Sequence, residues 1–281
     1  MVVIKHRVTG QTLLEVAGDT LAGAVLDGAV LLYADLSGAD LRGARLRGAD
    51  LCQADLREAQ LDGASLTEAD VTLANLAGTS FRSATLADAR LQAVNLDATG
   101  IAGTDFRGAE LTRVNLKNSN LSGCMFGDAE MRRVDLTHTN LTGAALVGAD
   151  LTEANFSYSS LHGTDLSYSM LVSALFNEVD LRDANLRQCE LALAVLNGVS
   201  LAGADLTNAQ LSRTVLSRCH DLHYAAGLEE LRHLHPSSID LETLRHCLPG
   251  LSNAFLEAFG AEPSEIDALR DLRVPGRLPA Y

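Results

Sequence analysis

Six acidic side chains recur at intervals that are multiples of 20 residues. This acidic column consists of Asp50, Asp70, Glu110, Glu130, Asp150 and Glu190. Carboxylates held close together can bind a cation, exchange protons with a substrate or form a negative surface. No histidine or serine recurs beside them, so a catalytic pairing has no support. We therefore interpret the column as solvated residues of turns, where short acidic side chains bond to their own backbone.

A second group of chemically competent residues gathers near the C-terminus. It consists of His220, His223, His233, His235 and His246, with Cys219 and Cys247 nearby. A His-x-x-His pair with a distant third ligand can hold zinc. The spacing matches no established zinc motif, however, and helix-surface or capping roles are commoner for such histidines. We therefore expect no metal and no other cofactor.

The elements that carry these residues follow from an internal repeat of five. From Leu21 to Leu216, every fifth residue is large and apolar, which makes 40 consecutive positions, and 32 of them are leucine. The residue two places before each of these centres is small, and the residue just before it is often Asp or Asn. A period of five fits neither a helix nor a strand. It fits a chain that turns a corner every five residues, with the centre and the small residue inside.

Four such sides close a square coil of 20 residues. We name its faces A, B, C and D after their first centres, Leu21, Leu26, Leu31 and Leu36. The phenylalanines support this coil, because Phe106 and Phe126 are 20 residues apart, as are Phe156 and Phe176. Glycine recurs two places after most centres of face A, from Gly23 to Gly203. Because glycine favours positive φ, this column predicts that one corner uses a type II turn that the other corners use less often.

The five-residue repeat consists of tandem A(D/N)LXX units, such as those that begin Ala34-Asp35-Leu36 and Ala184-Asn185-Leu186. This sequence pattern is typical of one known protein family. Over residues 17–219, the chain resembles the pentapeptide-repeat family. The resemblance implies an all-β solenoid, a right-handed quadrilateral β-helix, here of about ten coils. At ~4.8 Å per coil such a rod is ~48 Å long, and its ends need caps.

Both ends differ from the repeat. Residues 1–16 predict an N-terminal β-hairpin cap, with its turn at Thr9-Gly10-Gln11. After Cys219 the five-residue period stops, and all five prolines lie in residues 220–281. We expect this segment to be an α-helical C-terminal cap or tail. The expected helices span 226–234, 238–247, 252–259 and 264–273. Ser264 and Asp267 resemble a capping box at the start of the last helix.

An outward column of face D changes character near the tail. It is polar from Asp35 to Asn155 and then becomes Leu175, Val195 and Val215, which we call the apolar strip. Adjacent outward apolar residues favour burial against another surface. Two alternatives are open: the tail folds back over the strip, or a second subunit or partner covers it. Tyr158 on face D and Tyr168 on face B are further candidate interaction residues, since tyrosine suits interfaces.

The composition of the chain argues against several classes of function and location. The 281 residues include 36 acidic and 22 basic ones, a net charge of −14, which disfavours direct binding of nucleic acid. No run of 18 apolar residues is present, which predicts no membrane span. Charges in the first seven residues argue against a signal peptide, and five irregularly spaced cysteines indicate a reducing compartment. We expect a cytoplasmic protein with free thiols, of which Cys124, Cys189 and Cys219 lie inside and Cys52 outside.

The sequence contains no P-loop, no dinucleotide fingerprint and no recurring nucleophile–base pair, so an enzyme is the least favoured class. A rigid, non-catalytic scaffold for protein–protein interaction is favoured, as a monomer or a homodimer. The resemblance supplies the alternative, because some family members mimic B-form DNA, bind DNA gyrase and protect it from quinolones or other topoisomerase poisons. Residues 1–219 carry 26 acidic and 17 basic residues, a net of −9, where ~48 Å of duplex carries ~28 charges. Arg113, Arg132 and Arg133 also interrupt face C.

Overall fold

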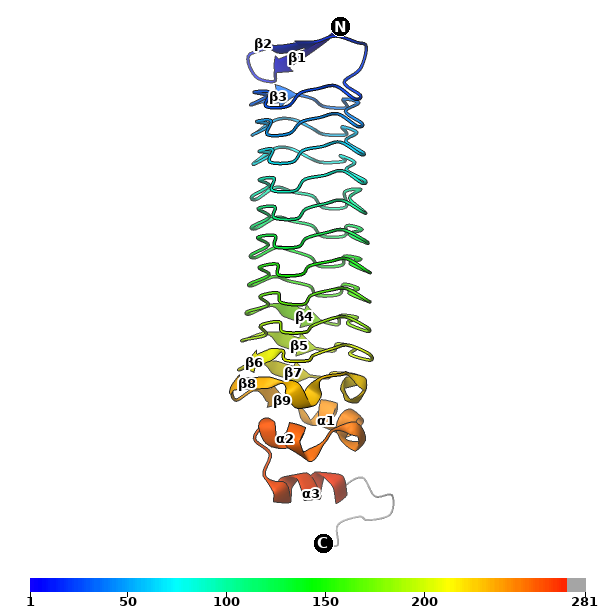
Figure 1. The fold of residues 1–281 in the computed structure, drawn as a ribbon, viewed down its shortest axis with the longest axis vertical. Coiled ribbons are helices and arrows are strands. Elements are labelled where there is room, and N and C mark those ends of the chain that lie inside the picture. Colours follow the sequence, from blue (N-terminus) through cyan, green and yellow to red (C-terminus); the bar gives the residue numbers. More distant parts are fainter. Residues whose placement is uncertain (272–281) are drawn as a thin grey trace.

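The computed structural model, which describes residues 1–271, is an elongated stack of coils (Figure 1). Residues 20 positions apart lie side by side and pair in parallel along the array, as Val25 pairs with Arg45. The backbone N–H of Leu26 donates to the carbonyl of Arg45 at 2.6 Å, and equivalent bonds join each coil to the next. This offset is the 20-residue coil that the five-residue period predicts. The number of coils and the roles of the two ends as caps stay predictions.

Most corners of the coil are the same kind of turn. The carbonyl of the centre accepts the N–H three residues later, as Leu21 does from Ala24 at 3.0 Å. The corners after Phe176, Leu196, Leu211 and Leu216 lack this bond, and the chain there continues as a short strand. The residue two after the centre has positive φ throughout, whether it is Gly23 at 66°, Tyr33 at 57° or Glu153 at 59°. The expectation that face A has a special turn type is therefore wrong. The hydrogen bonds between coils thus hold the residue two after the centre at positive φ on all four faces, whichever residue occupies the position.

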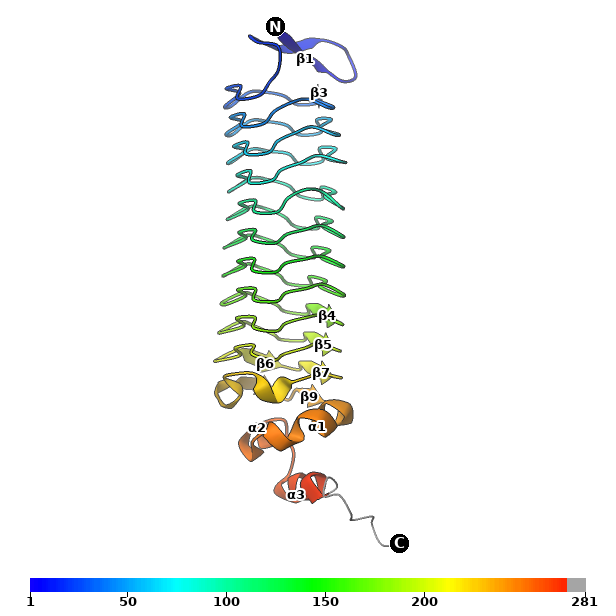
Figure 2. The same cartoon turned by 90° about the vertical axis from the view of Figure 1, so that its right-hand side faces the viewer.

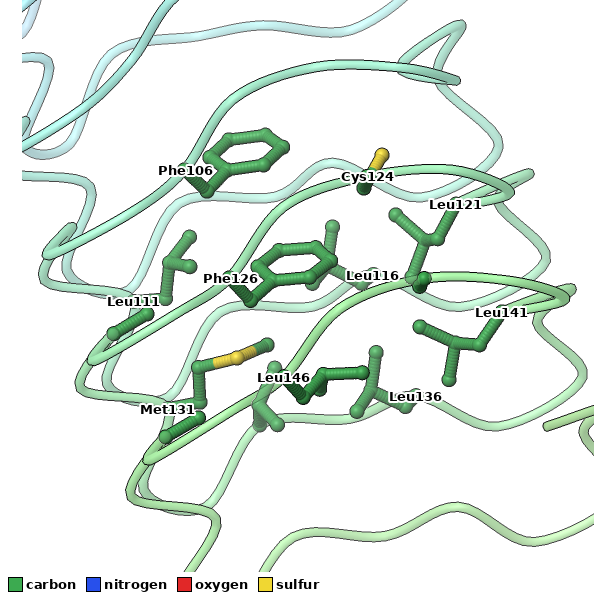
Figure 3. Close-up of a cluster of buried hydrophobic side chains, with 14 of the residues drawn as sticks. Phe106, Leu111, Leu116, Leu121, Cys124, Phe126, Met131, Leu136, Leu141 and Leu146 are labelled. Carbon is green, nitrogen blue, oxygen red and sulfur yellow. The ribbon is translucent and has the colours of Figure 1, made fainter. Parts of the chain in front are cut away.

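The centres form a continuous core along the axis. All 40, from Leu21 to Leu216, are buried, and the most exposed of them retains 5% of its surface. The two phenylalanine ladders stack as their spacing predicts. The ring centroids of Phe106 and Phe126 lie 5.1 Å apart (Figure 3), and those of Phe156 and Phe176 lie 4.9 Å apart. A bulky ring therefore fits where the neighbouring coil carries one at the same place.

The N-terminal segment forms the expected hairpin. Strand β1 (Val2–His6) pairs antiparallel with β2 (Thr12–Val16). On its other edge β1 pairs with β3 (Ala34–Asp35), in the first coil. The side chain of Ile4 is buried and belongs to the same core cluster as the centres.

Three-residue strands appear near the C-terminal end of the array, where neighbouring coils pair over three residues. They are β4 (Leu175–Asn177), β5 (Val195–Asn197), β6 (Gln210–Ser212) and β7 (Val215–Ser217). Strands β4, β5, β7 and β9 (Ser238–Ile239) form one parallel sheet on face D, and β6 pairs with β8 (Arg232–His235).

The pairing continues past the predicted boundary at Cys219. Four successive partners are Ser200 with His220, Asp205 with Ala226, Gln210 with Arg232 and Val215 with Ser238. The offset grows from 20 to 23 residues, because each side of this coil has one extra residue. The helix expected over 226–234 is therefore wrong: the segment contains a short 3-10 turn, Leu228–Glu230, and then β8. Backbone pairing to the preceding coil outweighs the helical preference of this segment.

Three short helices follow this coil: α1 (Leu241–Cys247), α2 (Asn253–Ala258) and α3 (Pro263–Asp271). A further 3-10 turn, Leu248–Gly250, separates α1 from α2. The Asp240 carboxylate accepts the Thr243 N–H at 2.8 Å, which caps α1, and the Ser217 hydroxyl at 2.8 Å. Phe255 of α2 is buried at the end of the leucine core.

The expected start of the last helix is wrong. Ser264 and Asp267 form no capping box, and the Glu265 carboxylate instead accepts the N–H of Glu262 at 2.9 Å. Because Pro263 at the first helical position has no N–H to donate, the helix begins there, one residue before Ser264. The predicted end of this helix, at residue 273, lies outside the described residues.

Candidate interaction surface

The apolar strip lies in register on one parallel sheet. Leu175 of β4 pairs with Val195 of β5, which pairs with Val215 of β7. Leu175 is 39% exposed and Val215 36% exposed, while Val195 is partly buried between them. The structure thus brings the three predicted residues together on the outside of the rod, one in each of three successive coils.

The described part of the tail, residues 220–271, does not fold back over this strip, contrary to the first alternative. Strand β9 adds to the same sheet beside β7, and Ser238 continues the column after Val215. Helices α1, α2 and α3 follow beyond the end of the stack in both views (Figures 1 and 2). The chain extends the sheet instead of folding back, because an open strand edge offers unpaired backbone groups that the next segment can satisfy. Coverage by another protein stays a prediction.

Two further exposed residues enlarge the strip. Leu193 is 50% exposed at the corner between faces C and D, and Met170 is 36% exposed on face C. Leu193 precedes Val195 by two residues, so the apolar area wraps around this corner. We call the five residues Met170, Leu175, Leu193, Val195 and Val215 the apolar surface. The signal for Leu193 was available in the sequence, since the same corner column holds polar Glu153 and Ser173 in the two preceding coils.

The two candidate tyrosines are exposed but do not lie together. Tyr158, 57% exposed, stacks on His138 with ring centroids 5.0 Å apart. It occupies the corner that leads from face D to face A. Tyr168, 59% exposed, occupies the corner between faces B and C. The structure therefore places Tyr168 away from the strip on face D.

The aspartates of the acidic column hold turns. The Asp50, Asp70 and Asp150 carboxylates accept the backbone N–H two residues later, at 3.0, 2.9 and 3.1 Å. These bonds stabilise the turn that follows each centre and account for Asp or Asn just before it. This arrangement is the structural role that the sequence favours for the column.

Arginine side chains interrupt the acidic column and form ion pairs with some of its carboxylates. Arg90 stands between Asp70 and Glu110, with its Nε 4.0 and 3.7 Å from their carboxylates. Arg132 bonds to Asp150. Burial raises the pKa of Asp150, but hydrogen bonds from Thr152 and Arg132 outweigh burial and the net shift is downward. Met170 separates Asp150 from Glu190. The column is thus a mixed surface and not an unbroken negative one.

The family model described as pentapeptide repeats matches in eight copies, over residues 21–57, 34–72, 59–97, 89–128, 129–167 and 173–223. The chain belongs to the pentapeptide-repeat family. Proteins of this family fold as right-handed quadrilateral β-helices. No curated protein matches the chain.

Solved pentapeptide-repeat structures resemble this one. HetL, from the cyanobacterium Nostoc sp. strain PCC 7120 and involved in the regulation of heterocyst differentiation, is 28% identical, with a TM-score of 0.53. The match covers 68% of this chain and 83% of HetL. QnrB1, a plasmid-mediated fluoroquinolone resistance protein, is 21% identical over 66% of this chain and 86% of its own, with a TM-score of 0.46.

The C-terminal histidines and cysteines are spread over the last coil of the pentapeptide-repeat array and α1. Within residues 1–271, no three His, Cys, Asp or Glu side chains converge in a way that could hold a metal ion. His233 packs edge-on against Phe259 with centroids 4.9 Å apart, and burial lowers its pKa. His235 bonds to the Ser212 hydroxyl at 2.9 Å. Within the same described part of the chain, no helix is long and apolar enough to cross a membrane.

Four of the five cysteines are buried. The Cys124 thiol donates to the Ile101 carbonyl at 2.9 Å, and burial raises its pKa to about 11. Burial raises the pKa of Cys189 and Cys219 to about 12 and also raises that of Cys247. Cys52 is partly exposed, as the sequence predicts, but burial and then the charges of Asp70 and Asp50 raise its pKa as well.

These thiols predict a labelling pattern. At pH 8 a chromogenic thiol reagent should modify only Cys52 in the native protein, and more slowly than an unfolded thiol, because the thiolate is the reactive form. All five should react in denaturant. Asp70→Asn should accelerate the native reaction, since it removes a repelling charge. Native labelling of Cys124 at the rate of Cys52 would contradict the burial described above.

Proposed function

We propose that this protein is a non-catalytic, rigid scaffold that binds another protein through the apolar surface. The observation that carries the proposal is the outward, in-register placement of Leu175, Val195 and Val215 on a hydrogen-bonded sheet. Because the sheet is formed before binding, little conformational entropy is lost when a partner arrives. Burying each aliphatic side chain contributes up to about 1.5–3 kcal/mol. Leu193 and Met170 add to the apolar area.

Val195→Asp should abolish capture of the partner. The substitution puts a charge in the centre of the apolar surface, where a partner would have to desolvate it. Asn115→Asp is the matched control, because Asn115 occupies the same column of face D four coils earlier. Immobilised wild type and Asn115→Asp should retain the same partner from native cytoplasm, whereas Val195→Asp should lose it. Circular dichroism should show all three proteins folded.

Size-exclusion chromatography identifies the partner class. If the partner is a second copy, the wild type elutes as a dimer and Val195→Asp as a monomer. If the partner is a different protein, the wild type, Asn115→Asp and Val195→Asp all elute as monomers. Partner capture that is equal in Val195→Asp and wild type would contradict the proposal. Recovery of gyrase subunits with both proteins would instead support the DNA mimic, which the divided acidic column disfavours.

A further inference from the structure

A groove of about 410 Å³ lies along the corner between faces C and D in the middle of the array. Residues of four successive coils line it, at the two positions that follow each centre of face C. Its charged lining consists of three arginines and one glutamate: Arg113, Arg132, Arg133 and Glu153. The groove is therefore a locally basic site on a chain whose net charge is −14.

Two of the three arginines already have carboxylate partners. Arg133 bonds to both oxygens of Glu153 at 2.8 and 3.0 Å, and Arg132 bonds to Asp150. Among residues 1–271, no carboxylate oxygen lies within 4.0 Å of a guanidinium nitrogen of Arg113, the distance that defines an ion pair. Arg113 is exposed, and its planar set of donors lines the groove without a side-chain acceptor among residues 1–271.

The residues above and below Arg113 in its corner column explain why no carboxylate of residues 1–271 pairs with it. The column runs Ala93, Arg113, Arg133, Glu153 in successive coils. Arg133 has Glu153 beside it, and Coulomb attraction from Arg113 adds to the bonds of Arg133 in lowering the pKa of Glu153. On its other side Arg113 has Ala93, whose methyl group leaves room where a carboxylate would sit. Arg113 and Arg133 are one coil apart, about 4.8 Å, so an anion beside Ala93 would offset their repulsion.

We propose that this groove binds the carboxylate of an acidic side chain on a partner polypeptide, with Arg113 as its principal ligand. The fork of donors on arginine matches the two oxygens of a carboxylate. The neighbouring Glu110 and Glu130 of the acidic column disfavour a densely charged phosphate or nucleic acid. The assignment rests on the proposed function in one respect only, that the ligand is a polypeptide. The same corner column reaches Leu193 four coils further on, so an extended partner can contact both regions.

Binding of a fluorescein-labelled peptide that holds one glutamate among neutral residues, followed by fluorescence anisotropy, tests this assignment. Arg113→Gln should weaken binding roughly tenfold or more, because a hydrogen-bonded charge pair is lost. Arg82→Gln is the matched control: it removes one positive charge on face A, outside the groove, and should leave binding close to that of the wild type. Binding to the wild type should weaken as salt increases.

Ala93→Glu gives a second, independent readout. Glutamate is tolerated at this corner, since Glu153 holds the same positive φ of about 60° as Ala93. The new carboxylate should pair with Arg113 inside the chain, so that peptide binding falls while the melting temperature stays the same or rises. A folded Ala93→Glu variant that binds the peptide as well as the wild type would overturn the assignment.

Two further outcomes decide between sources of the anion. Equal peptide binding by Arg113→Gln and wild type would overturn the site. Binding of inorganic phosphate at Arg113 with no binding of the peptide would overturn the polypeptide ligand. Val195→Asp should lose the protein partner but keep the peptide, which separates failure of this assignment from failure of the proposed function.

Discussion

Leu116→Asp should unfold the middle of the array. The Leu116 side chain is fully buried on the axis of the coils, with the phenylalanine ladder of Phe106 and Phe126 in the same part of the core (Figure 3). A carboxylate at this place would be surrounded by apolar side chains and closed off from solvent, and an uncompensated buried charge costs at least about 4 kcal/mol. We expect the free energy of unfolding, measured by urea denaturation, to fall by at least that amount or the protein to be recovered unfolded.

The control for this change is one residue away. Asn115→Asp introduces the same carboxylate on the outer surface, where the Asn115 amide oxygen already accepts the N–H of Lys117 at 3.1 Å. Its stability should stay within about 0.5 kcal/mol of the wild type. If the two variants were equally stable, the phase of the repeat would be wrong at this position.

The pH dependence of the buried variant has a definite sign. Burial raises the pKa of an aspartate because it disfavours the charged form. The folded state of Leu116→Asp therefore binds more protons than the unfolded state above about pH 4. Its stability should fall relative to the wild type as the pH rises from about 4 toward neutrality. Asn115→Asp should show no such fall over this range.

Gly227→Ala should detach the last coil and the helices that follow it. Gly227 has a φ of 77°, and an added Cβ would lie 2.2 Å from the backbone nitrogen of Thr207 and 2.4 Å from its Cα. Backbone atoms cannot rotate away as a side chain does, so the two coils must separate. Strain at positive φ and overpacking together should cost at least about 3 kcal/mol. Hydrogen exchange should then show residues 220–271 opening while the array before them stays protected.

Gly143→Ala separates the two causes. Gly143 also has positive φ, at 64°, but no atom lies within 4 Å of an added Cβ. It should therefore lose only about 1 kcal/mol. Equal losses in Gly143→Ala and Gly227→Ala would show that contact with Thr207 is unimportant. Opening of the last coil in Gly227→Ala should also expose Leu206, Leu211 and Leu216 at the end of the core and promote aggregation.

The sequence by itself determined the coil and its interior. A strict period of five places each centre at the same point of every side, so burial of Leu116 and stacking of Phe106 on Phe126 follow from counting. The exposure of Leu175 and Val215 follows from the same phase. These properties are predictable because each residue contacts its counterpart 20 positions away, and one regular spacing therefore describes the whole array.

Only the tertiary structure decided what departs from that regularity. The coil from His220 to Ile239 has no period of five, and its partners are identified only by backbone pairing to the coil before it. The same pairing carries β9 into the sheet of the apolar strip, so residues 220–271 of the tail leave the strip uncovered. That no carboxylate of residues 1–271 pairs with the Arg113 guanidinium depends on where long side chains of neighbouring coils point. Side-chain directions and irregular pairings depend on contacts between residues far apart in the chain, which a local pattern does not encode.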